Sequence, residues 1–316
     1  MAGERRIATL IGFTAVLMWS LLALFTAASG AVPPFQLIAL AFTIGGLLGL
    51  AWIALSGRWR DLRQPWQAWV LGVGGLFGYH FFYFTALRNA PPVEASLIAY
   101  LWPLLIVVLS AALPGERLRW HHIVGALLGL AGTGLIVTGG AALSIDLDYV
   151  PGYAAAFVCA VTWSTYSLMS RRFSAVPTGA VAGFCLMTAA LSAVAHLLTE
   201  ATVWPATTAE WLAVLALGLM PVGAAFYVWD YGVKRGDIQV IGASAYAAPL
   251  LSTGILILTG FAEATSAIGV AALLIAGGGA LAARDMWRGG VSPPEQPTKD
   301  PGSHDGRRDA APPPIT

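Results

Sequence analysis

Two short segments, each with a tyrosine three residues before a proline, carry the most distinctive chemistry of the sequence. They are Tyr100-Leu101-Trp102-Pro103 and Tyr246-Ala247-Ala248-Pro249, and both residues recur with an offset of 146 positions. Proline has no amide hydrogen and clashes with the carbonyl group four residues earlier, so each segment predicts a bent helix. The bends release the carbonyl oxygens of Ala99 and Ala245, which could accept hydrogen bonds from a substrate ammonium group deep in an apolar environment.

Side chains near these segments form a candidate binding site. Trp19, Trp102 and Trp163 each lie about ten residues into an apolar run, or some 15 Å deep at the helical rise, where an indole N–H needs a polar partner. His80 lies at the depth of Tyr100 and is costly there unless it faces a partner or water. The other candidates at this depth are hydroxyl and backbone groups: Ser20, Tyr83, Ala99, Ser164, Ser244, Ala245 and Tyr246. Together they predict an aromatic-lined cavity that binds an amphipathic molecule.

These residues also have structural interpretations. A deep tryptophan can serve packing alone, and a neutral His80 can be bonded to a hydroxyl such as that of Tyr83. We expect His196, near the end of its run, to meet lipid headgroups. Asp230 precedes Lys234 by one helical turn, which favours a local ion pair over a coupling site.

Composition places the chain in the membrane. Of 316 residues, 57% are hydrophobic and 10% are charged, which is too few to cover a water-soluble surface. The net charge of +1 does not indicate a partner, and the absence of a basic cluster on a soluble domain argues against nucleic acid. Cys159 and Cys185 lie in apolar runs, where packing is the expected role, and the sequence predicts no disulfide, metal site or cofactor.

Ten apolar runs have the length of membrane-spanning helices. Their predicted limits are residues 7–27, 35–55, 66–87, 93–113, 122–139, 151–170, 176–198, 210–233, 238–260 and 266–283.

The chain repeats itself after five runs. Phe13, Trp19-Ser20 and Gly125 recur as Phe157, Trp163-Ser164 and Gly269, all 144 positions later. We therefore predict two five-helix halves, residues 1–143 and 144–288. Residues 289–316, rich in proline and charge, are expected to form a disordered tail.

Basic residues predict the orientation. With the N-terminus in the cytoplasm, all Lys and Arg except Arg88 fall in inner segments, so both termini are expected inside. Five is an odd number of crossings, and the second half is therefore expected to insert upside down relative to the first. Inverted repeats are typical of secondary transporters, whose sites lie at the interface of the halves near mid-membrane.

The motifs resemble a known family. Residues 114–118, Pro-Gly-Glu-Arg-Leu, followed by Gly125-Ala126-Leu127-Leu128-Gly129, together with the two Trp-Ser pairs, resemble EamA-type members of the drug/metabolite transporter superfamily. The aromatic segment at residues 100–103 looks most like the YddG-type aromatic amino-acid exporters. This resemblance implies an all-α protein of the bacterial inner membrane with ten helices in two inverted repeats. It also implies export of large neutral amino acids such as Phe, Tyr and Trp, with Met and Thr as further candidates, by a monomer in the lipid bilayer without a cofactor.

Other functions remain open at this stage. The substrate could be another amphipathic metabolite or a drug, and transport could be facilitated or coupled to protons through His80. Duplication is also compatible with a channel or a membrane scaffold. Ser244 with His80 would be the minimal elements of an intramembrane serine protease, although the motif is degenerate and that chemistry leaves the duplication unexplained.

Overall fold

The computed structural model describes residues 2–142, 146–260 and 263–287, and every regular element in these ranges is a helix. The predicted tail, residues 289–316, lies outside them.

The first half contains seven α-helices whose limits follow the predicted apolar runs within a few residues. They are α1 (Ala2–Trp19), α2 (Leu22–Ala28), α3 (Pro34–Ser56), α4 (Trp66–Asn89), α5 (Pro92–Ala99), α6 (Trp102–Leu109) and α7 (Trp120–Thr138), with short 3₁₀ turns η1 (Trp59–Leu62) and η2 (Ser110–Ala112).

The second half continues in the same way. Its elements are η3 (Leu147–Tyr149), α8 (Val150–Arg172), η4 (Thr178–Ala180), α9 (Val181–Thr199), α10 (Thr208–Leu219), η5 (Met220–Ala224), α11 (Ala225–Arg235), α12 (Ile238–Ser244), α13 (Ala247–Leu258), α14 (Ser266–Ala282) and α15 (Arg284–Trp287).

Local sequence explains where the helices begin and end. Prolines occupy the first turns of α3, α5 and α8. An amide hydrogen in the first turn would have no acceptor within the helix, so proline costs no helical hydrogen bond there. The Asp237 carboxylate accepts from the amides of Gln239 and Val240 and so caps α12. Gly57 and Gly139 end α3 and α7 with positive φ angles of 68° and 62°, a conformation that glycine adopts without strain.

Eight helical stretches among the described residues are long and apolar enough to cross a membrane, which makes the chain a multi-pass membrane protein. They are Gly3–Ala28, Pro34–Ser56, Trp66–Asn89, Pro92–Ala112, Trp120–Thr138, Thr178–Thr199, Thr208–Arg235 and Ile238–Leu258. Helix α14 is apolar but shorter, and α8 falls outside this set. Helix α8 buries three serines, Ser164, Ser167 and Ser170, which lower its hydropathy.

Four of these stretches are interrupted, two of them where proline predicted it. The break between α5 and α6 falls at Tyr100-Leu101, just before Pro103, and the break between α12 and α13 falls at Ala245-Tyr246, just before Pro249. Two more interruptions were not predicted. One separates α1 from α2 at residues 20–21, and the other is the π-helical turn η5, which contains Pro221.

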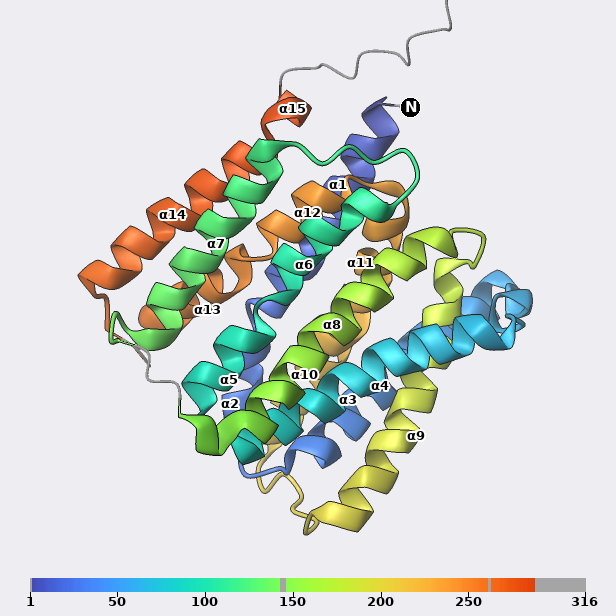
Figure 1. Cartoon of the computed structure of the whole chain (residues 1–316). Coiled ribbons are helices and arrows are strands. Elements are labelled where there is room, and N and C mark those ends of the chain that lie inside the picture. The colour runs from blue at the N-terminus through green and yellow to red at the C-terminus, as the bar shows by residue number, and fades with distance from the viewer. Residues whose placement is uncertain (1, 143–145, 261–262, 288–316) are drawn as a thin grey trace, which may run out of the picture.

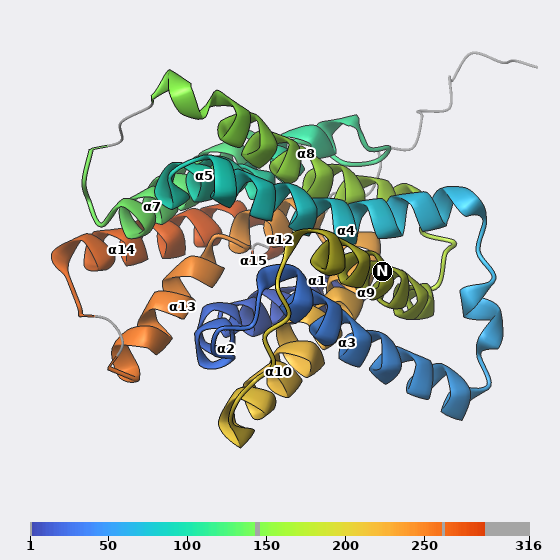
Figure 2. The same cartoon turned by 90° about the horizontal axis from the view of Figure 1, so that it is seen from below.

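The long helices pack in pairs that join the two halves (Figure 1). Helix α1 lies along α11, α3 along α9, α4 along α8 and α7 along α14. The start of α7 meets the end of α14, because Arg119 pairs with Asp285 and the Arg284 guanidinium lies over the Trp120 ring. Helices α7 and α14 therefore run in opposite directions, and so do α3 and α9, since the amide of Phe35 donates to Glu200. Seen from below, α7 and α14 lie side by side at one edge of the bundle (Figure 2).

Close backbone approach at glycine predicts a stability difference within α7. A Cβ at Gly125 would lie 2.5 Å from the carbonyl oxygen of Gly278, whereas one at Gly134 would meet only Leu97 Cδ2 at 3.9 Å. We expect Gly125→Ala to lose about 1–3 kcal/mol through overpacking. Gly134→Ala should be neutral or slightly stabilising, because alanine has the higher helix propensity. Thermal unfolding of the two purified variants in detergent checks this, and equal midpoints would refute the tight α7–α14 contact.

Candidate functional site

Four tryptophans meet at the centre of the described structure. Trp19 lies 6.1 Å from Trp102 and 5.8 Å from Trp163, and Trp102 lies 6.3 Å from Trp163, measured between ring centroids. The three predicted tryptophans thus come together from α1, α6 and α8. The fourth member is Trp229 of α11, 4.9 Å from Trp19 and 5.7 Å from Trp102. We call these four residues the tryptophan cluster, and most of its ring pairs meet edge to face.

Sequence reasoning missed Trp229. It lies near the inner end of its apolar run, one residue before Asp230, so its depth gave no signal. The residue is nevertheless fully buried, and its indole N–H donates to the Ser167 hydroxyl at 3.1 Å. The π-helical turn from Met220 to Ala224 shifts the face of the helix that follows it and turns Trp229 inward, and no sequence pattern marked this turn.

A closed circuit of rings adjoins the cluster. Trp163 contacts Tyr79 at 5.4 Å, Tyr79 contacts His80 at 5.3 Å, and His80 contacts Phe42 at 5.3 Å. Phe42 stacks on Phe226 at 5.3 Å, and Phe226 returns to Trp163 at 5.8 Å. Phe42, Tyr79 and Phe226 were not among the predicted residues. Their rings extend the aromatic packing around Trp163 from α8 to α3, α4 and α11.

The polar groups of the cluster fall into two classes. The indole N–H of Trp19 donates to the carbonyl oxygen of Pro221 at 3.0 Å, and the Ser164 hydroxyl lies 3.0 Å from the carbonyl oxygen of Trp102. These groups hold the helices together. Trp102 and Trp163 are buried in the core, and their indole N–H groups have no hydrogen-bond partner among the described residues.

The hydrogen-bond partner of His80 is not the Tyr83 hydroxyl that the sequence suggested. Its Nδ1 lies 2.7 Å from the carbonyl oxygen of Leu76, which fixes the proton on Nδ1, whereas Tyr83 pairs with the Ser96 hydroxyl at 3.4 Å. Tyr83 stacks on Tyr79 and so belongs to the same aromatic wall. Tyr100, at the break before α6, is half-buried.

Other predicted groups are used within the fold. The hydroxyls of Ser20 and Ser244 donate to the carbonyl oxygens of Leu17 and Ile241 in their own helices. The Ala245 carbonyl oxygen accepts from the Ala248 amide at 3.1 Å and is therefore not released. Ala99 is buried, and the nitrogen of Pro103, four residues later, cannot donate to its carbonyl oxygen.

Tyr246 lies at the second break but outside the tryptophan cluster. It is fully buried against α7, and its hydroxyl accepts from the amide of Leu104 in the first turn of α6 at 3.2 Å. One break is thereby tied to the other.

A charge network joins helix ends at the end of the bundle where α1 begins (Figure 1). The Glu116 carboxylate, 4% exposed, pairs with Arg171 and with Arg5, the latter at 2.9 Å. Arg5 also pairs with Asp237 at 3.1 Å, and Arg171 donates to the carbonyl oxygens of Val233 and Gly236. This network links the start of α1 and of α12 with the ends of α8 and α11.

At the other end, Glu200 holds three helices. Its carboxylate accepts from the amides of Phe35 and Gln36 at the start of α3, and from Arg88 at 2.9 Å. His196 Nδ1 lies 3.0 Å from the same carboxylate. The expectation that His196 meets headgroups is therefore wrong: the residue is only 6% exposed, and its second nitrogen lies 2.9 Å from the Thr202 hydroxyl.

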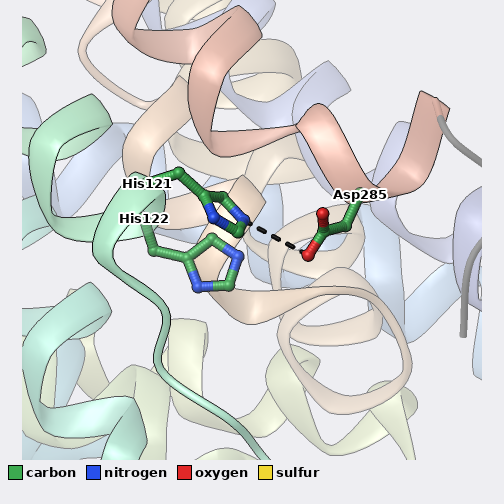
Figure 3. Close-up of side chains that lie close together, drawn as sticks. All are labelled: His121, His122 and Asp285. Carbon is green, nitrogen blue, oxygen red and sulfur yellow. Dashed lines mark ion pairs between the residues drawn. The ribbon is translucent and has the colours of Figure 1, made fainter. Parts of the chain in front are cut away.

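Figure 3 shows a third polar cluster, His121, His122 and Asp285, where α7 begins and α14 has ended. His121 Nε2 lies 3.3 Å from Asp285 Oδ2. The Arg119 guanidinium already pairs with this oxygen, and His122 Nδ1 accepts from the Arg119 amide, which leaves the His122 proton on Nε2. These contacts favour an ion-paired junction between two helices over a metal site, because a cation would compete with Arg119 and with the His122 proton.

Comparison with known proteins identifies the family. The sequence profile described as EamA-like transporter family matches residues 6–138 and again 150–284. The chain belongs to the EamA-like transporter family.

Individual EamA-like relatives cover nearly the whole chain. One from Ancylobacter novellus, named aromatic amino acid exporter YddG, is 60% identical over 88% of this chain and 98% of its own length. A protein of the same name from Escherichia coli K12 is 25% identical over 88% of this chain and 97% of its own length. A solved crystal structure with 59% sequence identity superimposes with a TM-score of 0.86 and covers 90% of this chain and 98% of its own.

The charge network of this EamA-like protein yields a matched prediction. Glu116 is buried between two arginines, whereas Glu263, the nearest glutamate at the corresponding place in the second half, is exposed. Glu116→Gln should cost about 1–3 kcal/mol, because Arg171 loses its charged partner in a half-buried place. Glu263→Gln should leave stability unchanged. Thermal unfolding of both variants measures the difference, and an unaffected Glu116→Gln variant would show that the network does not hold the helix ends.

Proposed function

We propose that this EamA-like protein exports aromatic and other large neutral amino acids across the bacterial inner membrane. The observation that carries the proposal is the tryptophan cluster, in which the indole N–H groups of Trp102 and Trp163 have no protein partner among the described residues. The relative named aromatic amino acid exporter, 60% identical over nearly its full length, supports the same substrate class.

The chemistry of the site fits a neutral substrate. An aromatic side chain stacked on Trp102 or Trp163 would gain about 0.5–1.5 kcal/mol beyond its burial. The substrate carboxylate would accept from these indole N–H groups, with Ser20, Ser164, Ser244 and His80 as further donors if their present bonds open. The ammonium group would donate to the Ala99 carbonyl oxygen and to the hydroxyls of Tyr83 and Tyr100. A site built from uncharged groups binds weakly, which suits release to the outside.

We propose that the ten helical units form two inverted five-helix repeats, residues 1–143 and 144–288, with both termini in the cytoplasm. The double match of the family profile supports the duplication. The opposite directions of α7 and α14, the fifth helices of the two halves, support the inversion. In such a transporter the repeats exchange conformations and expose the site alternately to the two sides.

The transport cycle would use the broken helices as moving parts. Breaks before Pro103 and Pro249 lie beside the site, and Tyr246 of the second half bonds to the first turn of α6. The protein would work as a monomer without a cofactor. Either facilitated export or proton antiport fits the site, because His80 is its single imidazole among the described residues.

The test is counterflow in liposomes with a panel of amino acids, amphipathic drugs and other metabolites, with and without a pH gradient. Saturable exchange of Phe, Tyr or Trp is the expected result. Preference for a drug or a non-amino-acid metabolite would overturn the substrate class, and flux without saturation would indicate a channel.

Trp102→Ala and Trp163→Ala should each raise the KM for phenylalanine about tenfold, because each removes a stacking surface and an N–H donor. Trp66→Ala is the control, since Trp66 is 70% exposed at a helix end. Unchanged uptake kinetics in the folded Trp102 and Trp163 variants would place the site elsewhere.

Pro103→Ala should restore a helical hydrogen bond to the Ala99 carbonyl oxygen, straighten the α5–α6 break and lower turnover severalfold. Single-turnover and steady-state exchange rates measure this. A variant with wild-type turnover would show that the break is not needed for the cycle.

A further inference from the structure

A second, smaller site lies between the tryptophan cluster and the charge network around Glu116. It is centred on two side chains of α11 that form the ion pair expected from their spacing. Lys234 Nζ lies 2.8 Å from Asp230 Oδ1, and the two side chains are only 6% and 2% exposed. Lys234 also donates to the Val176 carbonyl oxygen at 2.9 Å, and Thr178 donates to Asp230 Oδ2 at 2.7 Å.

Stability alone does not explain a pair buried this deeply. Taking two charges out of water costs several kcal/mol per ion, and apolar residues of similar volume are often as stabilising or more so. Ionisable residues inside membrane-spanning segments are expensive and usually mark a pathway or a binding group.

The pair borders a small cavity with room for about one water molecule. Tyr166 and Ser170 of α8 add hydroxyls to its lining, and the rings of Phe173 and Phe184 add an apolar wall. Tyr166 is 2% exposed, and its hydroxyl has no hydrogen-bond partner among the described residues. A buried, unpartnered hydroxyl beside an ion pair has hydrogen-bonding capacity left over, and the cavity next to it has room for one water-sized polar group.

The cavity lies directly beneath the tryptophan cluster. The Tyr166 ring packs 5.2 Å from Trp163, and Trp229 is the residue before Asp230. On its other side, Arg171 donates to the carbonyl oxygens of Val233, the residue before Lys234, and of Gly236, two residues after it, and Arg171 belongs to the Glu116 network. The pair therefore lies between the Glu116 network and the residues that contact the tryptophan cluster.

We propose that Asp230 and Lys234 form a loading sub-site for the zwitterionic head of an amino acid that arrives from the cytoplasm. The proposal rests on the function proposed above. When the inner helix ends part, the substrate ammonium group replaces Lys234 at Asp230, and the substrate carboxylate replaces Asp230 at Lys234. One ion pair is exchanged for two, the aromatic side chain lies against Phe184 and Phe173, and Tyr166 donates to the carboxylate.

The sub-site selects for both charges of the substrate. An amine without a carboxylate would separate the pair and leave Lys234 buried without a partner, and an acid without an ammonium group would do the same to Asp230. In the absence of substrate the two side chains neutralise each other, so that the inner end can close empty.

Uptake of labelled phenylalanine into inside-out vesicles, whose outer face is the cytoplasmic side, tests this sub-site. Phenethylamine and 3-phenylpropionate serve as competitors that lack one charge each. Vesicles from cells without the protein give the background. The wild-type protein should bind phenylalanine at least tenfold better than either competitor.

Removing one charge should invert the preference. Lys234→Met should raise the KM for phenylalanine about tenfold or more and make phenethylamine the better competitor. Asp230→Asn should do the same in favour of 3-phenylpropionate. Asp61→Asn is the control, because Asp61 is a mostly buried carboxylate paired with Arg58 outside this cavity. Folded Asp230 and Lys234 variants with wild-type KM and competitor order would overturn the proposal.

The exchanged pair, Asp230→Lys with Lys234→Asp, covers the case in which the single variants do not fold. It keeps an ion pair but reverses the head group relative to the aromatic wall, so phenylalanine affinity should stay at least tenfold below wild type. Wild-type transport by this variant would show that the pair is structural. Absence of saturable phenylalanine uptake by the wild-type protein would instead refute the proposed function.

Discussion

The hydrogen bond from the Trp19 indole to the Pro221 carbonyl oxygen is the contact on which the centre of the molecule depends. In a bilayer an unsatisfied backbone group costs several kcal/mol, so a broken helix needs a partner at each break. Here the partner comes from the other half of the chain: Trp19 satisfies the π-helical turn η5, and Tyr246 satisfies the first turn of α6. The Ser164 hydroxyl completes the set at the Trp102 carbonyl oxygen.

This reciprocity explains why the tryptophans gather where they do. Trp19, the last residue of α1, reaches the π-helical turn η5, whereas Trp229 donates to Ser167 of the uninterrupted helix α8. The N–H groups of the cluster are therefore used in different ways. The indole N–H groups of Trp19 and Trp229 donate hydrogen bonds to protein acceptors, whereas those of Trp102 and Trp163 have no partner among the described residues.

Much of this arrangement could be predicted from sequence, because hydropathy and proline act locally. The ten predicted runs correspond to helical units, and the breaks at Pro103 and Pro249 fall where the proline rule places them. Features that depend on which side a helix presents could not be predicted. Trp229 and Asp230 lie near the end of a run, and no local signal distinguishes a headgroup-facing side chain from one turned inward by the π-helical turn. His196 was predicted wrongly for a different reason: its partner Glu200 lies one helical turn later, a local pairing that depth along the run does not reveal, and α3 holds this carboxylate only in the folded chain.

The carboxylate of Glu200 has a mechanical consequence. It accepts hydrogen bonds from the first amides of α3 and pairs with Arg88 at the end of α4 and with His196 of α9. These contacts join three uninterrupted helices at one end. Helices joined in this way, and without breaks of their own, are expected to move together. Bending is then expected at the interrupted stretches, at residues 20–21, 100–101, 220–224 and 245–246.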